Sequence, residues 1–483
     1  RFPYIPQALA ELGLDPGLRS RRLWAFLDSS YRLRADIDYL ADRWQRSGIA
    51  ALHVAAWHYN EADAQRDAWL RKLIEACHRR AILVYAWLEL PHVSERFWHE
   101  HPDWREKTAA GQDAHLDWRK LMNLQNADCR EAVLRSTRAL VERFDWDGLN
   151  LGELYFESLE GAANPARFTP FNGDVRRMYR ERYGADPAIS DQRFLDFRAE
   201  LARDMQQYWI AALDGMRREL GRELDLTLTH VDDRFDTRMR DAIGADAARV
   251  LPMLEDHDFT FLVEDPATVW HLGPERYSEI ASRYAPLARA PEKLAIDINV
   301  VERYQDVYPT KQQTGTELFQ LVRTASQAFP RVALYFESSI APIDAALLPA
   351  AAAVTTRFER VSGKLVVESP RGVGIAWSGP ALVDGVPWPF ASADTVWLPA
   401  GAHAVERGAA DPRLRVLHFN GELRSAAASA AGIEFSYESQ ARAMAILNAA
   451  PESVEVDGQP AKPLILPGNV LMLPRGQHFV SLR

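Results

Sequence analysis

The sequence predicts a (β/α)8 barrel followed by a small all-β domain. Three observations support this prediction. Short apolar runs alternate with amphipathic helical stretches over the first ~345 residues, long polar loops follow the third and fourth runs, and helical periodicity stops near residue 355. A chain of 483 residues is too long for a single hydrophobic core. We therefore place the barrel in residues 1–345 and a β-rich accessory domain in residues 355–483.

The eight apolar runs have the length and the β-branched or aromatic content of buried strands. Near-continuous apolar strands that alternate with amphipathic helices indicate a parallel sheet covered by helices. Eight such units in this length predict a closed barrel. The runs are 23–27, 49–55, 82–87, 148–151, 224–229, 259–263, 294–298 and 332–336.

Between these runs lie segments whose apolar residues recur at helical spacing. In 35–47, Ile37, Leu40 and Trp44 share one face, and Asn126 or Asp128 is suited to cap the helix that ends near residue 144. A doubly wound sheet is the main rival fold, but no GxGxxG or Walker pattern follows any run. The other expected helices are 63–80, 128–144, 191–220 and 316–329.

The charge balance limits the classes of partner. The formal net charge is −10 and the pI is about 5.8, which argues against a nucleic-acid partner and suits a neutral or cationic ligand. No apolar run reaches ~18 residues, so we expect no membrane span. We expect Cys77 and Cys129 to be buried as small apolar side chains, and no CxxC or HxxxH spacing supports a zinc site. We expect no metal and no cofactor.

Carboxylates or tryptophans follow every predicted strand. In a barrel, the side chains that perform chemistry stand at the carboxyl ends of the strands, so these residues are the candidate site. In chain order they are Asp28, then Trp57 and His58, Trp87 and Glu89, Glu153, His230 and Asp232, Glu264 and Trp270, Asp297 with Glu302 beyond it, and Glu337.

An acidic ring with aromatic members fits sugar hydrolysis. One carboxyl group protonates the leaving oxygen of a glycosidic bond, and a second attacks the anomeric carbon or activates water. Crowded carboxyls raise the pKa of one member, which keeps an acid protonated near neutral pH. Two alternatives stay open: a non-catalytic carbohydrate-binding barrel, and a metal-dependent or lyase-type enzyme in which His58, His230 and Asp232 would be ligands.

Three groups of segments carry a resemblance to a known family. The first is His101-Pro102-Asp103-Trp104, Gly111, 124–126 and 146–150; the second is 167–171 with 181–187; the third is 27–31 with 84–87. Together they resemble bacterial glycoside-hydrolase-like barrels, which include the C-terminal hydrolase domain of the poly-N-acetylglucosamine deacetylase PgaB. The resemblance covers roughly residues 20–340.

The resemblance implies a polysaccharide substrate, such as an amino-sugar polymer of biofilms, and a periplasmic or secreted protein. The chain begins at Arg1, so we expect that a leader or upstream segment preceded it. The family usually shows Asp at the end of strand four, where this chain has Glu153. Glu153 resembles instead the acid/base of the large retaining glycosidase clan.

We therefore expect Glu153 to act as acid/base, with Asp297 and Glu337 as competing candidates for the second catalytic role. The other strand-end residues would bind substrate or tune the electrostatics. These are Asp28, Trp57, His58, Trp87, Glu89, His230, Asp232, Glu264 and Trp270.

The C-terminal region contains an internal repeat. Residues 396–405 match 471–480, and each copy follows an Asp-Gly turn, at Asp384 and at Asp457. Two similar units predict a sandwich or a pair of related sheets. His403 and His478 occupy equivalent places, which favours a structural role. Three tryptophans of this region are expected in its core rather than on a sugar platform: Trp377, Trp388 and Trp397.

Overall fold

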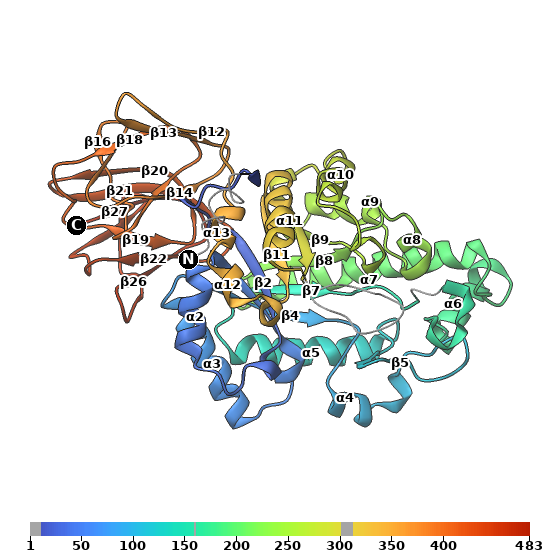
Figure 1. Ribbon diagram of the computed structural model, residues 1–483. Helices are drawn as coiled ribbons and strands as arrows, with labels where there is room; N and C mark the ends of the chain where they lie inside the picture. The colour runs from blue at the N-terminus through green and yellow to red at the C-terminus, as the bar shows by residue number, and fades with distance from the viewer. Residues whose placement is uncertain (1–10, 159–160, 301–312) are drawn as a thin grey trace.

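Eight parallel strands close into a barrel at the centre of the first domain, as predicted. The computed structural model describes residues 11–158, 161–300 and 313–483. Neighbouring strands are hydrogen-bonded in chain order, and the last strand pairs with the first (Figure 1). The barrel strands are β2 (Leu23–Leu27), β3 (Ile49–Ala55), β4 (Leu83–Glu89), β7 (Gly148–Gly152), β8 (Asp225–Val231), β9 (Thr260–Glu264), β10 (Leu294–Asn299) and β11 (Arg331–Tyr335).

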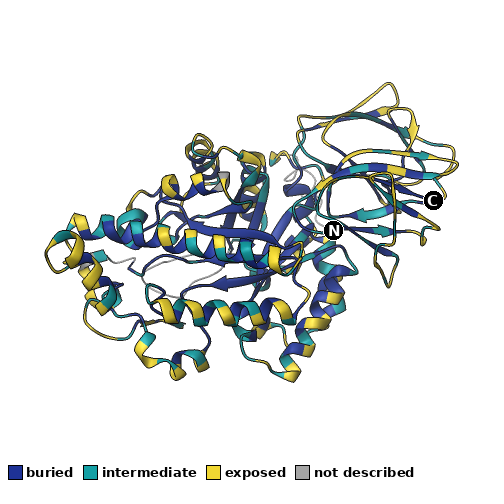
Figure 2. Cartoon of the chain, turned by 180° about the vertical axis from the view of Figure 1, so that it is seen from behind, coloured by how far each residue is buried: buried dark blue, intermediate teal, exposed yellow. Residues whose placement is uncertain are grey.

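Amphipathic helices cover the outside of the barrel. Their inner faces are buried and their outer faces are exposed (Figure 2). Acidic and amide side chains cap the first turns: Asp36 accepts two backbone N–H groups, and Asn126 accepts that of Cys129. The main helices are α2 (Ile37–Arg46), α3 (Ala64–His78), α5 (Ala127–Arg143), α7 (Gln192–Glu219), α10 (Glu275–Tyr284) and α11 (Gly315–Ala328).

The two long loops carry secondary structure of their own at the carboxyl end of the barrel. The loop after β4 holds α4 (Glu95–Glu100) and a hairpin of β5 (His115–Leu116) and β6 (Arg119–Lys120). The loop after β7 holds α6 (Gly173–Tyr183). Short helices α8 (Arg238–Ile243) and α9 (Ala247–Val250) follow β8, and α12 (Pro342–Ala345) and α13 (Leu348–Ala351) end the domain.

The barrel interior is filled by large side chains with a buried polar layer among them. The apolar members include Trp24, Phe26 and Tyr85. The amide Nδ2 of Asn150 lies 3.1 Å from Nδ1 of His53, and burial lowers the pKa of that imidazole to about 3. His53 is therefore neutral and belongs to the packed interior rather than to an acid–base site.

The second domain is built from antiparallel sheets around a separate core. Two of its four sheets have five strands each; in spatial order, the first is β12 (Arg357–Val361), β13 (Lys364–Ser369), β18 (Gly401–Arg407), β15 (Ala381–Val383) and β16 (Val386–Pro387), and the second is β20 (Glu422–Ser429), β21 (Gly432–Ser439), β27 (Gly476–Leu482), β23 (Val454–Val456) and β24 (Gln459–Ala461). The third sheet has the order β19 (Val416–Phe419), β22 (Ala443–Leu447), β26 (Val470–Leu473) and β25 (Ile465–Leu466). The fourth has the order β1 (Leu18–Arg19), β14 (Val373–Ala376) and β17 (Thr395–Leu398).

The sequence repeat becomes a repeated turn in this domain. Nδ1 of His403 lies 2.8 Å from Oδ2 of Asp384, and Nδ1 of His478 lies 2.7 Å from Oδ2 of Asp457. Each aspartate has a positive φ and also accepts a backbone N–H from the neighbouring strand. Each histidine thus holds a hairpin turn in place. The indoles of Trp388 and Trp397 are buried in the core, and Trp377 packs against it.

The two domains are joined by more than the chain connection. Strand β1 precedes the barrel in sequence, yet it pairs with β14 of the second domain. The side chain of Arg22, at the base of the barrel, forms an ion pair with Glu422. The domains consequently lie side by side, with the second domain against the amino-terminal end of the barrel (Figure 1).

Candidate active site

The alternation of side chains along each strand decides which of the candidate residues face the mouth of the barrel, the opening at the carboxyl ends of its strands. Successive side chains of a strand point to opposite sides of the sheet. On β4, β9 and β10 the interior residues Trp87, Leu262 and Ala295 are followed two positions later by Glu89, Glu264 and Asp297. These carboxyls therefore belong to the mouth. Cα of Asp297 pairs with that of Glu264 in the register of β10 and β9.

Arg119 on β6 joins three carboxylates of the mouth. Its Nε lies 3.1 Å from Oε1 of Glu89, and its Nη1 lies 2.7 Å from Oε2 of Glu153. Nη1 also contacts Glu157. The guanidinium is largely buried, and although burial opposes its charge, Glu153 and Glu89 raise the pKa of Arg119 above its ordinary value. Glu153 has a φ of 58°, directly after the last residue of β7.

A second acidic group lies on the β9 and β10 side of the mouth. Asp297 is 1% exposed, and burial together with the nearby charges of Glu264 and Asp265 raises its pKa well above the ordinary value. Like charges close together in a dry site disfavour one another, so this group favours a protonated Asp297. The buried Tyr155 lies within electrostatic range of both groups: burial, and then the charges of Glu153 and Glu264, raise its pKa.

Aromatic rings form one edge of the mouth. The ring centroids of Trp57 and Trp87 are 4.8 Å apart, and those of Trp57 and Trp118 are 5.7 Å apart. The indole of Trp118 is 49% exposed, on the turn between β5 and β6. Such a surface offers flat apolar faces to a sugar ring. Next to it, Nε2 of His58 lies 3.1 Å from Oδ1 of Asp28, and both side chains are partly exposed.

Glu337 is not part of this group. It is 1% exposed and accepts hydrogen bonds from Nε and Nη2 of Arg32, at 2.7 and 3.0 Å, and from the indole N–H of Trp44 on α2. Strand β11 ends at Tyr335, and a 3-10 turn begins at Glu337, so strand alternation no longer sets its direction. Its contacts are with Arg32, in the loop after β2, and with Trp44 on α2.

Three further candidates make structural contacts. His230 is fully buried next to Phe261, with Nε2 3.4 Å from Oδ1 of Asp233. The carboxylate of Asp232 accepts the backbone N–H groups of the following turn. The indole N–H of Trp270 donates to the carbonyl of Asp265. Glu302 lies outside the described residues.

Arg119, Tyr155 and Trp118 were missed by the sequence reasoning, which considered strand ends alone. All three lie in the long loops after β4 and β7. Residues 115–120 show a short alternation of apolar and polar side chains around Asp117, whose φ is 56°. That pattern is a hairpin signal and could have placed Arg119 and Trp118 on a turn above the mouth.

Neither a metal centre nor a membrane segment emerges from the part of the chain that the structure describes. In residues 11–158, 161–300 and 313–483, no three His, Cys, Asp or Glu side chains are grouped to hold an ion. Both cysteines are buried and unpaired by any disulfide. Among the same residues no helix is both long and apolar enough to cross a bilayer.

Comparisons with known proteins give matches in structure only. No family model and no curated protein matches the sequence. Among solved structures, the PgaB (BpsB) glycoside hydrolase domain of Bordetella bronchiseptica is 13% identical with a TM-score of 0.47, over 66% of this chain and 94% of that domain. A β-galactosidase of Marinomonas ef1 is 12% identical with a TM-score of 0.50, over 68% and 58%.

A β-galactosidase of the haloarchaeon Halorubrum lacusprofundi is 12% identical with a TM-score of 0.52, over 71% of this chain and 60% of that one. The chain has the barrel fold of glycoside hydrolases. At this identity the likeness concerns the fold, and the matched regions span less than two thirds of either galactosidase.

Proposed function

We propose that this protein is a glycoside hydrolase that cleaves a bacterial exopolysaccharide at the carboxyl end of its barrel. One observation carries the proposal: the mouth combines Glu153 beside Arg119 with the buried Asp297, whose pKa is raised, next to a tryptophan surface. A charged carboxylate and a protonated carboxyl are the two groups that glycoside hydrolysis requires.

The electrostatics of the mouth support a division of roles between the two carboxyls. The raised pKa of Asp297 suits a group that donates a proton to the glycosidic oxygen. Glu153 is placed against a guanidinium, which suits a group that acts as an anion, either as nucleophile or as base. The sequence had suggested Glu153 as the acid/base. Glu337 is left out of this scheme because a guanidinium and an indole N–H together engage both of its oxygens, which leaves neither free for a substrate.

The charge of the mouth favours one class of substrate. The carboxyls of Glu89, Glu153, Glu157 and Glu264 outnumber the single guanidinium of Arg119. Such a surface repels uronic acids and attracts neutral or amino sugars. An amino-sugar polymer of the poly-N-acetylglucosamine type is the substrate we favour, and a periplasmic or secreted location goes with it.

Release of reducing sugars from purified polysaccharides tests this proposal. The panel contains a β-1,6-glucosamine polymer, chitosan, a galactosamine polymer and cellulose. We expect the wild type to release sugar from one of them and Glu153→Gln and Asp297→Asn to lose more than about 100-fold in kcat, as removal of an acid or base does. Glu131→Gln, on the exposed face of α5, is the matched control and should be fully active.

Glu337→Gln separates the two candidates for the second carboxyl. It should lower thermal stability, because a buried ion pair loses a partner, and leave kcat near that of the wild type. Loss of kcat in Glu337→Gln with full activity in Asp297→Asn would overturn the assignment of roles.

A non-catalytic carbohydrate-binding barrel is the second candidate, and the triple pairing of Arg119 favours it. A guanidinium that holds Glu89, Glu153 and Glu157 together can serve as a fixed binding surface. Binding to a polymer without release of sugar, abolished by Trp57→Ala, would support this function and exclude hydrolysis.

A further inference from the structure

A cavity of about 300 Å³ lies between the two domains, at the end of the barrel opposite the proposed active site. Trp24, Tyr85 and Asp225 form its floor at the amino-terminal end of the barrel. Residues of the second domain, from Ala400 and from 420–424 and 438–441, close it from the other side. Nothing in the proposed hydrolysis uses this cavity.

Four arginines gather around one glutamate in this cavity. The guanidinium groups of Arg21, Arg22, Arg331 and Arg371 share the cavity with Glu422, which pairs with Arg22. Glu422 lies in the positive field of this group: although burial opposes ionisation, Arg22, Arg331 and Arg21 hold its pKa below the ordinary value. Asp225, Glu292 and Glu438 also line the cavity, together with Arg424, so its five guanidinium groups face four carboxyls. Burial raises the pKa of Asp225, which favours its neutral form and leaves an excess of positive charge.

Two of these arginines have donors without an acceptor. Nη1 of Arg21 and Nη1 of Arg331 are buried and have no hydrogen-bond partner within the described part of the chain. Burial lowers the pKa of Arg21 to about 9, and burial with the charge of Arg22 lowers that of Arg371 to about 10. Buried polar groups are normally satisfied, so such donors indicate that an acceptor belongs there.

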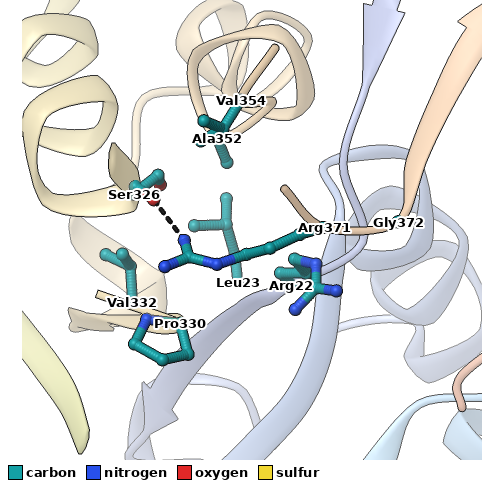
Figure 3. A pocket seen from close by; sticks show the side chains of 9 residues that line it. All are labelled: Arg22, Leu23, Ser326, Pro330, Val332, Ala352, Val354, Arg371 and Gly372. Carbon is teal, nitrogen blue, oxygen red and sulfur yellow. Dashed lines mark hydrogen bonds between the residues drawn. The ribbon is translucent and has the colours of Figure 1, made fainter. Parts of the chain in front are cut away.

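Aromatic rings and backbone carbonyls of the protein hold these arginines in place. The guanidinium of Arg21 stacks 4.3 Å from the ring centroid of Trp397, and that of Arg331 lies 5.6 Å from the ring of Trp24. Arg371 extends between the domains, where its Nη1 donates to the carbonyls of Ser326 and Phe329, with Arg22 beside it (Figure 3). A preorganised guanidinium fork matches the oxygens of an oxyanion.

We propose that this interdomain cavity is a binding site for a phosphate-type oxyanion, either inorganic phosphate or the phosphate group of a small phosphorylated compound. The anion accepts hydrogen bonds from Arg21 and Arg331 and balances the charge around Glu422. Because its binding residues come from both domains, it ties the second domain to the barrel and stabilises their arrangement.

Calorimetric titration of the full chain with inorganic phosphate, at constant ionic strength set by sodium chloride, tests the site. We expect saturable binding with a Kd below about 1 mM and a rise in Tm with phosphate. Arg21→Gln and Arg331→Gln should each weaken binding about 10-fold or more. Arg413→Gln, 93% exposed in the second domain, should bind as the wild type does.

Glu422→Gln provides a test of opposite sign. Removal of the competing carboxylate should tighten phosphate binding several-fold, which a general loss of folding cannot produce. The proposal is overturned if phosphate acts no differently from chloride, or if the two arginine variants bind as well as Arg413→Gln. A sugar phosphate that binds tighter than phosphate identifies a phosphorylated sugar as ligand, and equal binding identifies phosphate itself.

Discussion

Arg119 shows how one side chain organises the mouth of the barrel. It reaches from a hairpin in the loop after β4 to Glu89 at the end of β4 and to Glu153 after β7. The carboxylates repel one another, and the attraction of each to the guanidinium offsets that repulsion. The arrangement therefore depends on a residue that belongs to no barrel strand.

Replacement of Arg119 tests this dependence. Arg119→Met leaves Glu89 buried without its cation, and we expect a loss of about 3–5 kcal/mol in the free energy of unfolding, as when a buried pair is broken. Arg119→Lys should recover part of the lost stability because it restores a positive charge, but only part because one ammonium cannot pair with three carboxylates. Urea unfolding measures both, with Arg96→Met on exposed α4 as control; equal stability of all variants contradicts the prediction.

Glu106 predicts a pH dependence of stability. The side chain is 2% exposed, and burial raises its pKa from 4.5 to about 7. The unfolded chain releases this proton at lower pH than the folded chain, so stability from this group is full below pH 4.5 and falls as the pH rises to 7. The fall amounts to about 3 kcal/mol.

Urea unfolding at a series of pH values measures this effect, with Glu106→Gln as the comparison. An amide does not titrate, so the variant should lose this part of the slope between pH 4.5 and 7 and be more stable than the wild type at pH 7.5. Parallel stability curves for the two proteins would rule out a buried, titrating Glu106.

At the level of elements, the first residue of strand β7 has to be a glycine because a tyrosine ring of β4 packs against it. Gly148, its first residue, pairs with Tyr85 of β4, and a β-carbon built at that position would lie 2.3 Å from Cε1 of the ring and 2.8 Å from the carbonyl oxygen of Asp225. The absent side chain makes room for Tyr85, whose hydroxyl donates to the carboxylate of Asp225. The glycine is thus a packing requirement of the barrel.

Gly148→Ala should consequently destabilise the barrel by about 1–3 kcal/mol, the range for an overpacked core. Gly215→Ala is the matched control, because Gly215 lies inside α7 and, apart from its own stretch of helix backbone, no atom lies within 4 Å of the added carbon. That change should stabilise the protein by about 0.5–1 kcal/mol through helix propensity. Thermal unfolding of the two variants compares them, and a shift of the same sign would refute the packing argument.

At the scale of the whole molecule, ion pairs fasten the second domain to the barrel. Nε of Arg442 lies 2.7 Å from Oδ1 of Asp147, and its Nη2 lies 2.6 Å from Oδ1 of Asp145. Asp147 is fully buried, and although burial works against its charge, His78 and Arg442 hold its pKa below the ordinary value. The second domain thus neutralises a charge that the barrel buries.

Arg442→Ala should cost about 3–5 kcal/mol, since it removes one of the cations that face a buried carboxylate. We expect calorimetry to resolve two transitions in the variant where the wild type shows one. The wild type should also lose this stability as the pH falls through the lowered pKa of Asp147. A single unshifted transition in Arg442→Ala would show that the domains are coupled by other contacts.

The sequence by itself determined the barrel, its eight strands and the β-rich second domain. Apolar runs and helical spacing are local patterns, and they report directly which segments are buried strands and which are surface helices. Strand ends also predicted which carboxyls lie at the mouth of the barrel, because a barrel brings all its carboxyl ends to one face. Glu89, Glu153, Glu264 and Asp297 lie there.

Only the tertiary structure decided which carboxyls meet and which cation joins them. Glu337 lies two residues beyond β11, where a turn directs it to Arg32 and Trp44, and no local pattern reports that turn. Arg119 reaches the mouth from a hairpin about thirty residues from both strands it serves. Ion pairs and shared protons depend on distances between segments far apart in the chain, and such distances exist only after the barrel has closed.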